Sequence, residues 1–202
     1  MATKIDLNKL DEISKIVHCR TKDFIFTEHM NKDKPECFQK ITIQKCASAQ
    51  DVVFLETDKE GSSVQINGIL KKDLKKQADF AILLQKEETL YAYIVDCKST
   101  LKSNRVNEAM EQIEDSVRLI KFLLLETLNH QTDLLDLRHF KPKGLILHIG
   151  LSKSFSKTDF GQNRSRNGFD LSQNGQYPIT VKQVGLNSTH TFDDFLSYFK
   201  TA

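Results

Sequence analysis

The chain from Asp79 to Lys98 reads Asp79-Phe-Ala-Ile-Leu-Leu-Gln-Lys-Glu-Glu-Thr-Leu-Tyr-Ala-Tyr-Ile-Val-Asp-Cys-Lys98. Two apolar runs rich in β-forming residues flank the polar stretch 85–89, which predicts an antiparallel hairpin. If the turn centres on the two glutamates, Asp79 lies directly opposite Asp96, with Cβ atoms about 4.5–5.5 Å apart. Side chains alternate along a strand, so Lys98 shares a face with Asp96. The hairpin therefore predicts two carboxylates and one ammonium close together.

Two apposed carboxylates repel each other, and a divalent metal ion between them removes that penalty. Mg²⁺ takes one or two carboxylates together with water and phosphate oxygens, so Asp79 and Asp96 are candidate ligands. A bound metal polarises a phosphate and activates a water, and Lys98 could orient that water or neutralise developing charge. The alternative interpretation is that Asp79 only opens a strand, while Asp96 and Lys98 form a surface charge pair.

The segments Gln77-Ala78-Asp79 and, after a gap of sixteen residues, Asp96-Cys97-Lys98 resemble the motif of the PD-(D/E)xK nuclease superfamily. The resemblance covers about residues 35–150. It implies a restriction-endonuclease-like α-β-β-β-α-β core, in which the first Asp opens the second strand and the second acid and the Lys end the third. The sequence departs from the motif at Ala78, where the family has proline.

The resemblance also implies an activity, that of a Mg²⁺-dependent nuclease that hydrolyses phosphodiester bonds of DNA. RNA is not excluded as a substrate, and Mn²⁺ could substitute for Mg²⁺. Lys98 would position the attacking water, and Glu111 and Gln112 are candidates for polar contacts from the helix after the motif. The implied metal ligands are Asp79, Asp96, the backbone carbonyl of Cys97, and Glu36 of the first core helix, with Glu56 as the alternative to Glu36.

The biological setting that the family favours is restriction or another antiviral defence role, followed by an interbacterial nuclease toxin domain. Many family members form homodimers to cut both strands. A function of another class is the alternative: a catalytically inactive nuclease-like module that binds nucleic acid or a protein partner.

The flanking sequence predicts an α/β (α+β) chain with a central mixed sheet and a helix near each terminus. We expect a single domain over residues 1–202, with a core at about 35–150 and a C-terminal extension at 151–202. His148, in an apolar strand, should be a satisfied core residue. The aromatic stripe of the last helix should pack into the core, with a partner or dimer surface as the alternative. The expected elements are helices at 6–17, 35–46 and 103–129, strands at 52–55, 64–70, 79–84, 90–98 and 143–150, and a short helix capped by Thr191.

The formal net charge is only +2, so any surface that attracts nucleic acid has to be local. One basic run, 71–76, leads into Asp79, and a second group lies in 152–176, a stretch rich in Ser, Asn and Gly. A solvated turn and surface disorder are the alternatives for these two segments. The candidate nucleic-acid contacts are Lys71, Lys72, Lys75, Lys76, Lys102, Arg105, Arg164 and Arg166.

The sequence favours a cytoplasmic protein without membrane contact. No apolar run approaches the about 20 residues of a membrane-spanning helix, and no signal-peptide core follows the first residues. The four cysteines show neither paired-ligand nor disulfide-framework spacing, so we expect reduced thiols.

Overall fold

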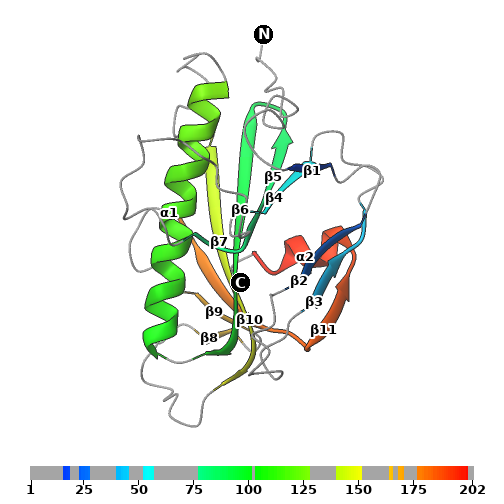
Figure 1. The fold of residues 1–202 in the computed structure, drawn as a ribbon, viewed down its shortest axis with the longest axis vertical. Helices are drawn as coiled ribbons and strands as arrows, with labels where there is room; N and C mark the ends of the chain where they lie inside the picture. The colour runs from blue at the N-terminus through cyan, green and yellow to red at the C-terminus, as the bar shows by residue number, and fades with distance from the viewer. Residues whose placement is uncertain are drawn as a thin grey trace.

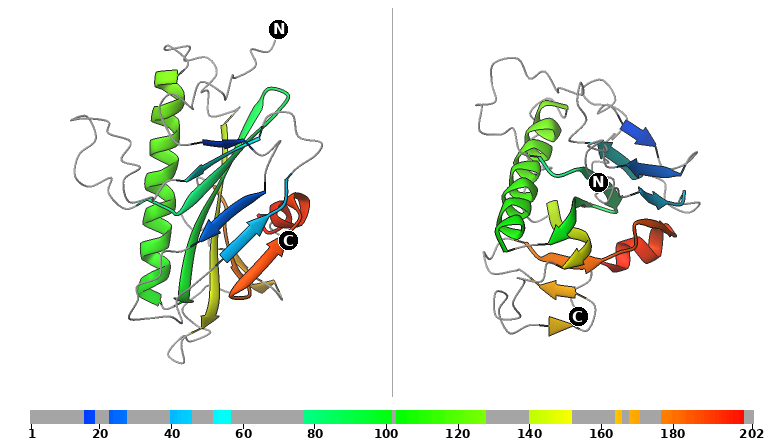
Figure 2. Two further views of the ribbon diagram at one scale, coloured as in Figure 1. Left: turned by 45° about the vertical axis from the view of Figure 1, so that its right-hand side comes forward. Right: turned by 60° about the horizontal axis from the view of Figure 1, so that its bottom comes forward.

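The computed structural model describes residues 16–18, 23–27, 40–45, 52–56, 77–101, 103–127, 140–151, 164–165, 168–170 and 177–199. Within these ranges the chain forms an α+β fold with two helices and two open, mixed β-sheets (Figure 1). Helix α1 (Ser103–Thr127) packs on one face of the larger sheet, and helix α2 (Phe192–Ser197) and the smaller sheet pack on the other (Figure 2). The larger sheet is therefore the middle layer of three.

The larger sheet has eight strands among the described residues, and its five longer strands form its centre. The spatial order is β1 (Ile16–His18), β4 (Val52–Glu56), β5 (Phe80–Lys86), β6 (Thr89–Leu101), β7 (Phe140–Leu151), β10 (Ile179–Gln183), β9 (Gly168–Asp170) and β8 (Arg164–Ser165). The neighbours β1, β4, β5 and β6 pair antiparallel, and β6, β7 and β10 pair parallel. Strand β9 pairs antiparallel with both β10 and β8.

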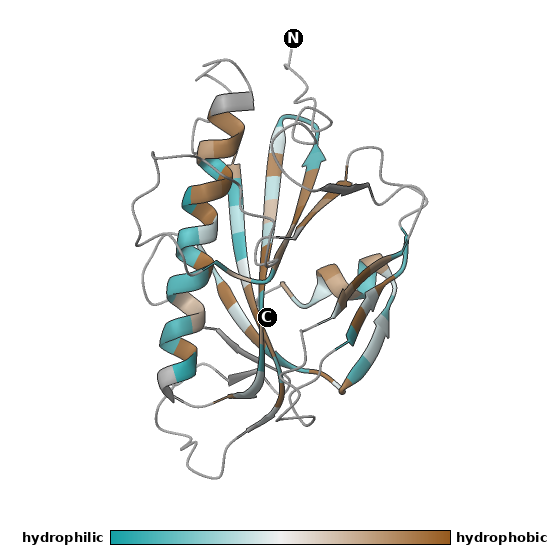
Figure 3. Cartoon of the chain, in the orientation of Figure 1, coloured by the Kyte–Doolittle hydropathy of each residue, from teal (hydrophilic) through white to brown (hydrophobic). Residues whose placement is uncertain are grey.

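Helix α1 (Ser103–Thr127) connects β6 to the parallel strand β7, as a crossover requires. Figure 3 shows that it carries both apolar and polar segments, as an amphipathic helix does. At Gly144 an added Cβ would lie 2.9 Å from Ile179 Cγ1 and 3.0 Å from Ile113 Cγ2, so the missing side chain lets α1 approach the sheet. The buried positions recur every three or four residues: Val106, Ala109, Ile113, Val117, Ile120 and Leu124.

The second face of the larger sheet is covered by a three-stranded sheet and by α2 (Phe192–Ser197). The smaller sheet has the order β11 (Asn187–His190), β3 (Lys40–Ile43), β2 (Phe24–Thr27). The rings of Phe24 and Phe54 stack at 4.4 Å between centroids and join β2 to β4. Thr191 caps α2 by accepting a hydrogen bond from the amide of Asp194, as its sequence predicts. The buried residues Phe192, Phe195 and Phe199 confirm that the aromatic stripe belongs to the core.

Several expected elements are confirmed: the hairpin of β5 and β6, the strands β4 and β7, and the long helix α1. His148 is buried, as expected for a core histidine, and its Nδ1 lies 3.2 Å from the carbonyl oxygen of Gly150. No helix among the described residues is long and apolar enough to cross a membrane.

Two predicted helices are wrong where the structure describes them. Residues 40–43 of the helix expected at 35–46 form strand β3, with Ile41 and Ile43 buried and Lys40 exposed. The β-branched run Ile41-Thr42-Ile43 favours a strand that packs one face inward. Ile16–His18, at the end of the helix expected at 6–17, pairs with β4 as strand β1. Pairing with β4 outweighed the helical spacing of the apolar residues. Residues 6–15, 35–39 and 46 of these helices and the strand expected at 64–70 lie outside the described residues, and residues 44 and 45 are described but form no helix.

The stretch 152–176 is not structureless throughout. Strands β8 and β9 pair antiparallel within it, and β9 extends the larger sheet beside β10. Arg164 therefore begins an edge strand instead of lying in a long loop. Backbone pairing between β8 and β9 forms these strands, although their side chains show no regular strand pattern that would predict them.

Candidate active site

The β5–β6 hairpin has the register that the sequence predicts. Phe80 lies opposite Val95 and Lys86 opposite Thr89, with a two-residue turn between the strands. The first turn residue, Glu87, has φ of 53°, the left-handed conformation that tight hairpin turns use. One step beyond the last pair, this register places Asp79 opposite Asp96.

Strand β5 begins at Phe80, opposite Val95, whereas β6 continues to Leu101. Asp79 therefore lies just before β5, beside the part of β6 that β5 does not cover. The amide of Cys97 donates a hydrogen bond to Asp79 Oδ2 at 2.5 Å. The N–H and C=O of one strand residue point to the same side, so the Cys97 carbonyl also faces the Asp79 side of β6. The side chain of Cys97 is buried with the core on the α2 side. Asp79 thus brings a carboxylate to the same edge as the Cys97 carbonyl.

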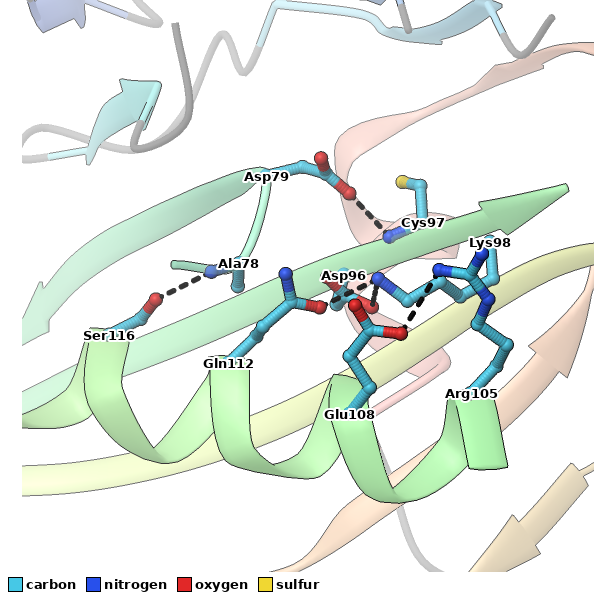
Figure 4. A network of polar contacts seen from close by, with 9 residues as sticks. All are labelled: Ala78, Asp79, Asp96, Cys97, Lys98, Arg105, Glu108, Gln112 and Ser116. Atoms are coloured by element: carbon cyan, nitrogen blue, oxygen red, sulfur yellow. Dashed lines mark hydrogen bonds and ion pairs between the residues drawn. The ribbon is translucent and has the colours of Figure 1, made fainter. Parts of the chain in front are cut away.

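Asp96 is fully buried on the α1 side of β6 (Figure 4). Its Oδ2 lies 2.8 Å from Lys98 Nζ, whereas its Oδ1 has no hydrogen-bond partner within the described part of the chain. Burial and the charge of Asp79 raise the pKa of Asp96 to about 8, although Lys98 opposes both effects. Asp79 and Asp96 are close enough to interact, but Asp79 turns to the strand edge and Asp96 toward the helix.

Helix α1 completes the network around Lys98 (Figure 4). Lys98 Nζ donates a hydrogen bond to Gln112 Oε1 at 2.7 Å. One turn before Gln112, Glu108 pairs with Arg105 at 3.0 Å. One turn after it, buried Ser116 accepts a hydrogen bond from the amide of Ala78 at 2.8 Å. The helix therefore fixes both the Lys98 ammonium and the backbone that leads to Asp79.

The other predicted residues are only partly placed. Glu111 is exposed, in contrast to Gln112. Glu56 is the last residue of β4, and its backbone lies opposite Phe80, the residue that follows Asp79. Of the basic candidates, Arg105 lies beside the site (Figure 4) and Arg164 lies in β8. Glu36, Lys71, Lys72, Lys75, Lys76, Lys102 and Arg166 lie outside the described residues.

Glu108 and Ser116 were not singled out from the sequence, although a signal was present. Together with Gln112 they recur every four residues, which places them on one stripe of the helix. Each is followed by a buried apolar residue, so the stripe borders the face that packs on the sheet. A polar stripe beside a packed face would have been visible on a helical projection.

The residues present suit a hard cation such as Mg²⁺. Within the part of the chain that the structure describes, no three or more His, Cys, Asp or Glu side chains are arranged to hold a metal ion. The oxygen donors at the end of the hairpin are nevertheless those that Mg²⁺ uses, since it commonly takes one or two carboxylates and completes its shell with water and phosphate. The buried Oδ1 of Asp96, which no described donor satisfies, fits a cation ligand.

Comparison of the chain with protein-family models, with curated proteins and with solved structures gives no match.

Proposed function

We propose that this chain is a metal-dependent nuclease that hydrolyses phosphodiester bonds of DNA, with Asp79, Asp96 and Lys98 as its catalytic residues. The observation that carries the proposal is the fully buried Asp96, which has an oxygen that no described donor satisfies, an ion pair with Lys98 and an apposed Asp79. Keeping such a carboxylate in the core costs stability unless a ligand uses it.

The order of elements supports the resemblance to the PD-(D/E)xK superfamily. Among the described residues, strands β4, β5 and β6, helix α1 and strand β7 follow one another as β-β-β-α-β, with Asp79 before the second of these strands and Asp96 and Lys98 late in the third. The first helix of the family core has no counterpart in 40–45, which form and follow β3. Helix α2 and the smaller sheet cover that face instead.

The cation supplies Lewis-acid polarisation of the phosphate and a more acidic water when it is bound. Asp79, Asp96 and the Cys97 carbonyl would hold it. Lys98 is fixed by Asp96 and Gln112, so its ammonium has a defined position where it can neutralise negative charge that develops on the phosphate.

The surroundings also favour a polyanionic substrate. Helix α1 begins two residues after β6 ends, so the positive end of its dipole lies at the same end of the sheet as Lys98. Arg105, in the first turns of α1, has a half-exposed side chain that can reach a phosphate.

The test is cleavage of supercoiled plasmid, linear duplex, single-stranded DNA and RNA by the full chain, with Mg²⁺, with Mn²⁺ and with chelator. We expect metal-dependent cleavage of DNA by the wild type, its loss in Asp96→Asn, and its retention in Asp193→Asn, which changes an exposed acid of α2. Equal cleavage by wild type and Asp96→Asn would remove the assigned site. Tight DNA binding without cleavage would assign the chain to the inactive, nucleic-acid-binding class, and cleavage of RNA alone would change the substrate.

A further inference from the structure

His148 lies beside Lys98 in the sheet. The parallel register of β6 and β7 pairs Lys98 with His148, and that of β7 and β10 pairs His148 with Gln183. Adjacent strands are about 4.8 Å apart, so the three positions form one continuous row. Ile146, two residues before His148, packs in the cluster that contains the buried face of α1, and alternation places His148 on the same side. The row therefore extends the candidate site from β6 across β7.

The hydrogen bonding of His148 fixes its tautomer. Its Nδ1 lies 3.2 Å from the carbonyl oxygen of Gly150, which can only accept, so Nδ1 carries the proton. In the neutral ring Nε2 is then the unprotonated nitrogen, and its lone pair can accept a proton. Burial lowers the pKa of His148, which favours this neutral form near physiological pH.

Lys98 is poorly suited to accept a proton, because its ammonium is paired with Asp96 Oδ2 at 2.8 Å. Phosphodiester hydrolysis by water releases one proton as the new P–O bond forms. Among the described residues, the charged groups that neighbouring elements place at this end of the sheet are Asp79 before β5, Asp96 and Lys98 of β6, and Arg105 and Glu108 of α1, while β10 places the uncharged Gln183. Among the described residues of this row, His148 is the neutral base.

We propose that His148 is the proton acceptor of the reaction, a role that rests on the proposed nuclease function. The water oxygen forms a bond to phosphorus, its proton passes to His148 Nε2, and the bond from phosphorus to the leaving oxygen breaks. The leaving oxygen takes a proton from solvent, and the imidazolium releases its proton to solvent. Lys98 then neutralises negative charge on the phosphate, and its neighbour His148 accepts the proton of the attacking water.

The first measurement needs no activity. ¹⁵N NMR of the histidine-labelled, metal-free chain should show His148 neutral at pH 7, with Nδ1 protonated and Nε2 unprotonated. His148→Asn identifies its signals. An Nε2-protonated tautomer or an imidazolium at that pH would overturn the proposal.

The second measurement is single-turnover cleavage at saturating DNA and Mg²⁺ between pH 5.5 and 9. His148→Asn and His148→Gln should lower the rate by about 100-fold or more and remove the acidic limb of the wild-type pH profile. Imidazole added to His148→Gly should restore part of the rate. His190→Asn, which changes a histidine packed beside Phe195 and Tyr198, is the matched control and should keep the wild-type profile.

Thermal unfolding of the same variants separates catalysis from folding. A folded His148→Asn chain with the wild-type rate and pH profile overturns the role of His148 and leaves the nuclease proposal standing, provided that Asp96→Asn is inactive. A wild-type chain that cleaves no nucleic acid overturns both.

Discussion

The Nζ atom of Lys98 lies 2.7 Å from Oε1 of Gln112, and this contact joins strand β6 to helix α1. The same ammonium pairs with Asp96. The Lys98 side chain is largely buried, with 13% of its surface exposed, so few other arrangements are open to it. Gln112 is therefore a positioning residue that acts through Lys98.

Replacing Gln112 by methionine keeps the length of the side chain and removes the acceptor. The ammonium should lose its fixed position, and single-turnover cleavage should fall about 10- to 100-fold with unchanged affinity for DNA. Gln112→Glu keeps an acceptor and should lose less activity. The matched control is Glu111→Gln at the exposed neighbour, which should behave as wild type. A Gln112→Met rate equal to wild type would mean that Asp96 alone positions Lys98.

Asp79 accepts a hydrogen bond from the Cys97 amide, and this contact should make the asparagine and alanine variants of Asp79 differ in stability. Asp79→Asn keeps an oxygen that can accept from the Cys97 amide, whereas Asp79→Ala leaves that amide without this acceptor. Both should abolish cleavage, since both remove a charged ligand. Only the alanine variant should lose stability, by about 1–3 kcal/mol, in urea unfolding. Relief of the repulsion between the two like charges opposes this loss, but it acts in both variants. Equal stability of the two variants would show that water replaces the carboxylate as acceptor.

The sequence predicts the centre of the fold well because its signals there are local. The apolar runs around Glu87 and Glu88 set the hairpin register, and the register alone places Asp79 opposite Asp96. The spacing of apolar residues likewise predicts α1. The strand at Lys40–Ile43 was missed because its partners, β2 and β11, are held by long-range pairing, and β11 is almost 150 residues away in the chain.

The site was predictable only in part, for a related reason. The motif gives Asp96 and Lys98 but not the face of α1 that meets them. Gln112 was a candidate, whereas Ser116 needed the packing of α1 against the sheet. His148 was correctly predicted to be buried, but its position beside Lys98 depends on the register of β6 with β7.

Asp96 should make the stability of the metal-free chain fall as the pH rises. Its pKa is about 8 in the folded chain and about 3.9 in an unfolded one, so between these values the folded state keeps a proton that the unfolded state releases. The stabilisation is complete below about pH 4 and is lost through pH 8, with a slope of at most about 1.4 kcal/mol per pH unit. Urea unfolding at pH 5, 6, 7 and 8 measures it.

Asp96→Asn isolates this effect, because it removes the titrating group and leaves the other ionisable residues in place. The difference in unfolding free energy between the variant and wild type should shift in favour of Asp96→Asn as the pH rises from 5 to 8. In Asp96→Asn the Lys98 ammonium loses its carboxylate partner, which lowers the unfolding free energy by an amount that does not depend on pH. This constant amount does not affect the comparison of how the two unfolding free energies change with pH. A difference that stays constant over this range would mean that Lys98 keeps Asp96 ionised in the folded chain.

Arg105 should contact the DNA backbone. Its guanidinium pairs with Glu108 beside Lys98, and about half of its side chain is exposed, so it can reach a phosphate that approaches Asp96. Arg105→Ala should weaken binding by a similar factor on every sequence and should reduce the log–log salt slope by about 0.9 units for duplex DNA. Fluorescence anisotropy at several salt concentrations, with Ca²⁺ in place of Mg²⁺, measures both quantities.

Arg118→Ala is the control for Arg105→Ala, because the two arginines share a helix and a similar setting. Arg118 is also exposed and pairs with Glu114 and Asp115, but it lies thirteen residues further along α1, about 20 Å away at 1.5 Å per residue. A phosphate path past Lys98 predicts an altered salt slope for Arg105→Ala and a wild-type slope for Arg118→Ala. Arg105→Lys should keep most of the slope, since a point charge suffices to displace a counter-ion. If both alanine variants lower the slope equally, the DNA follows the whole outer face of α1, and the path over the carboxylates is wrong.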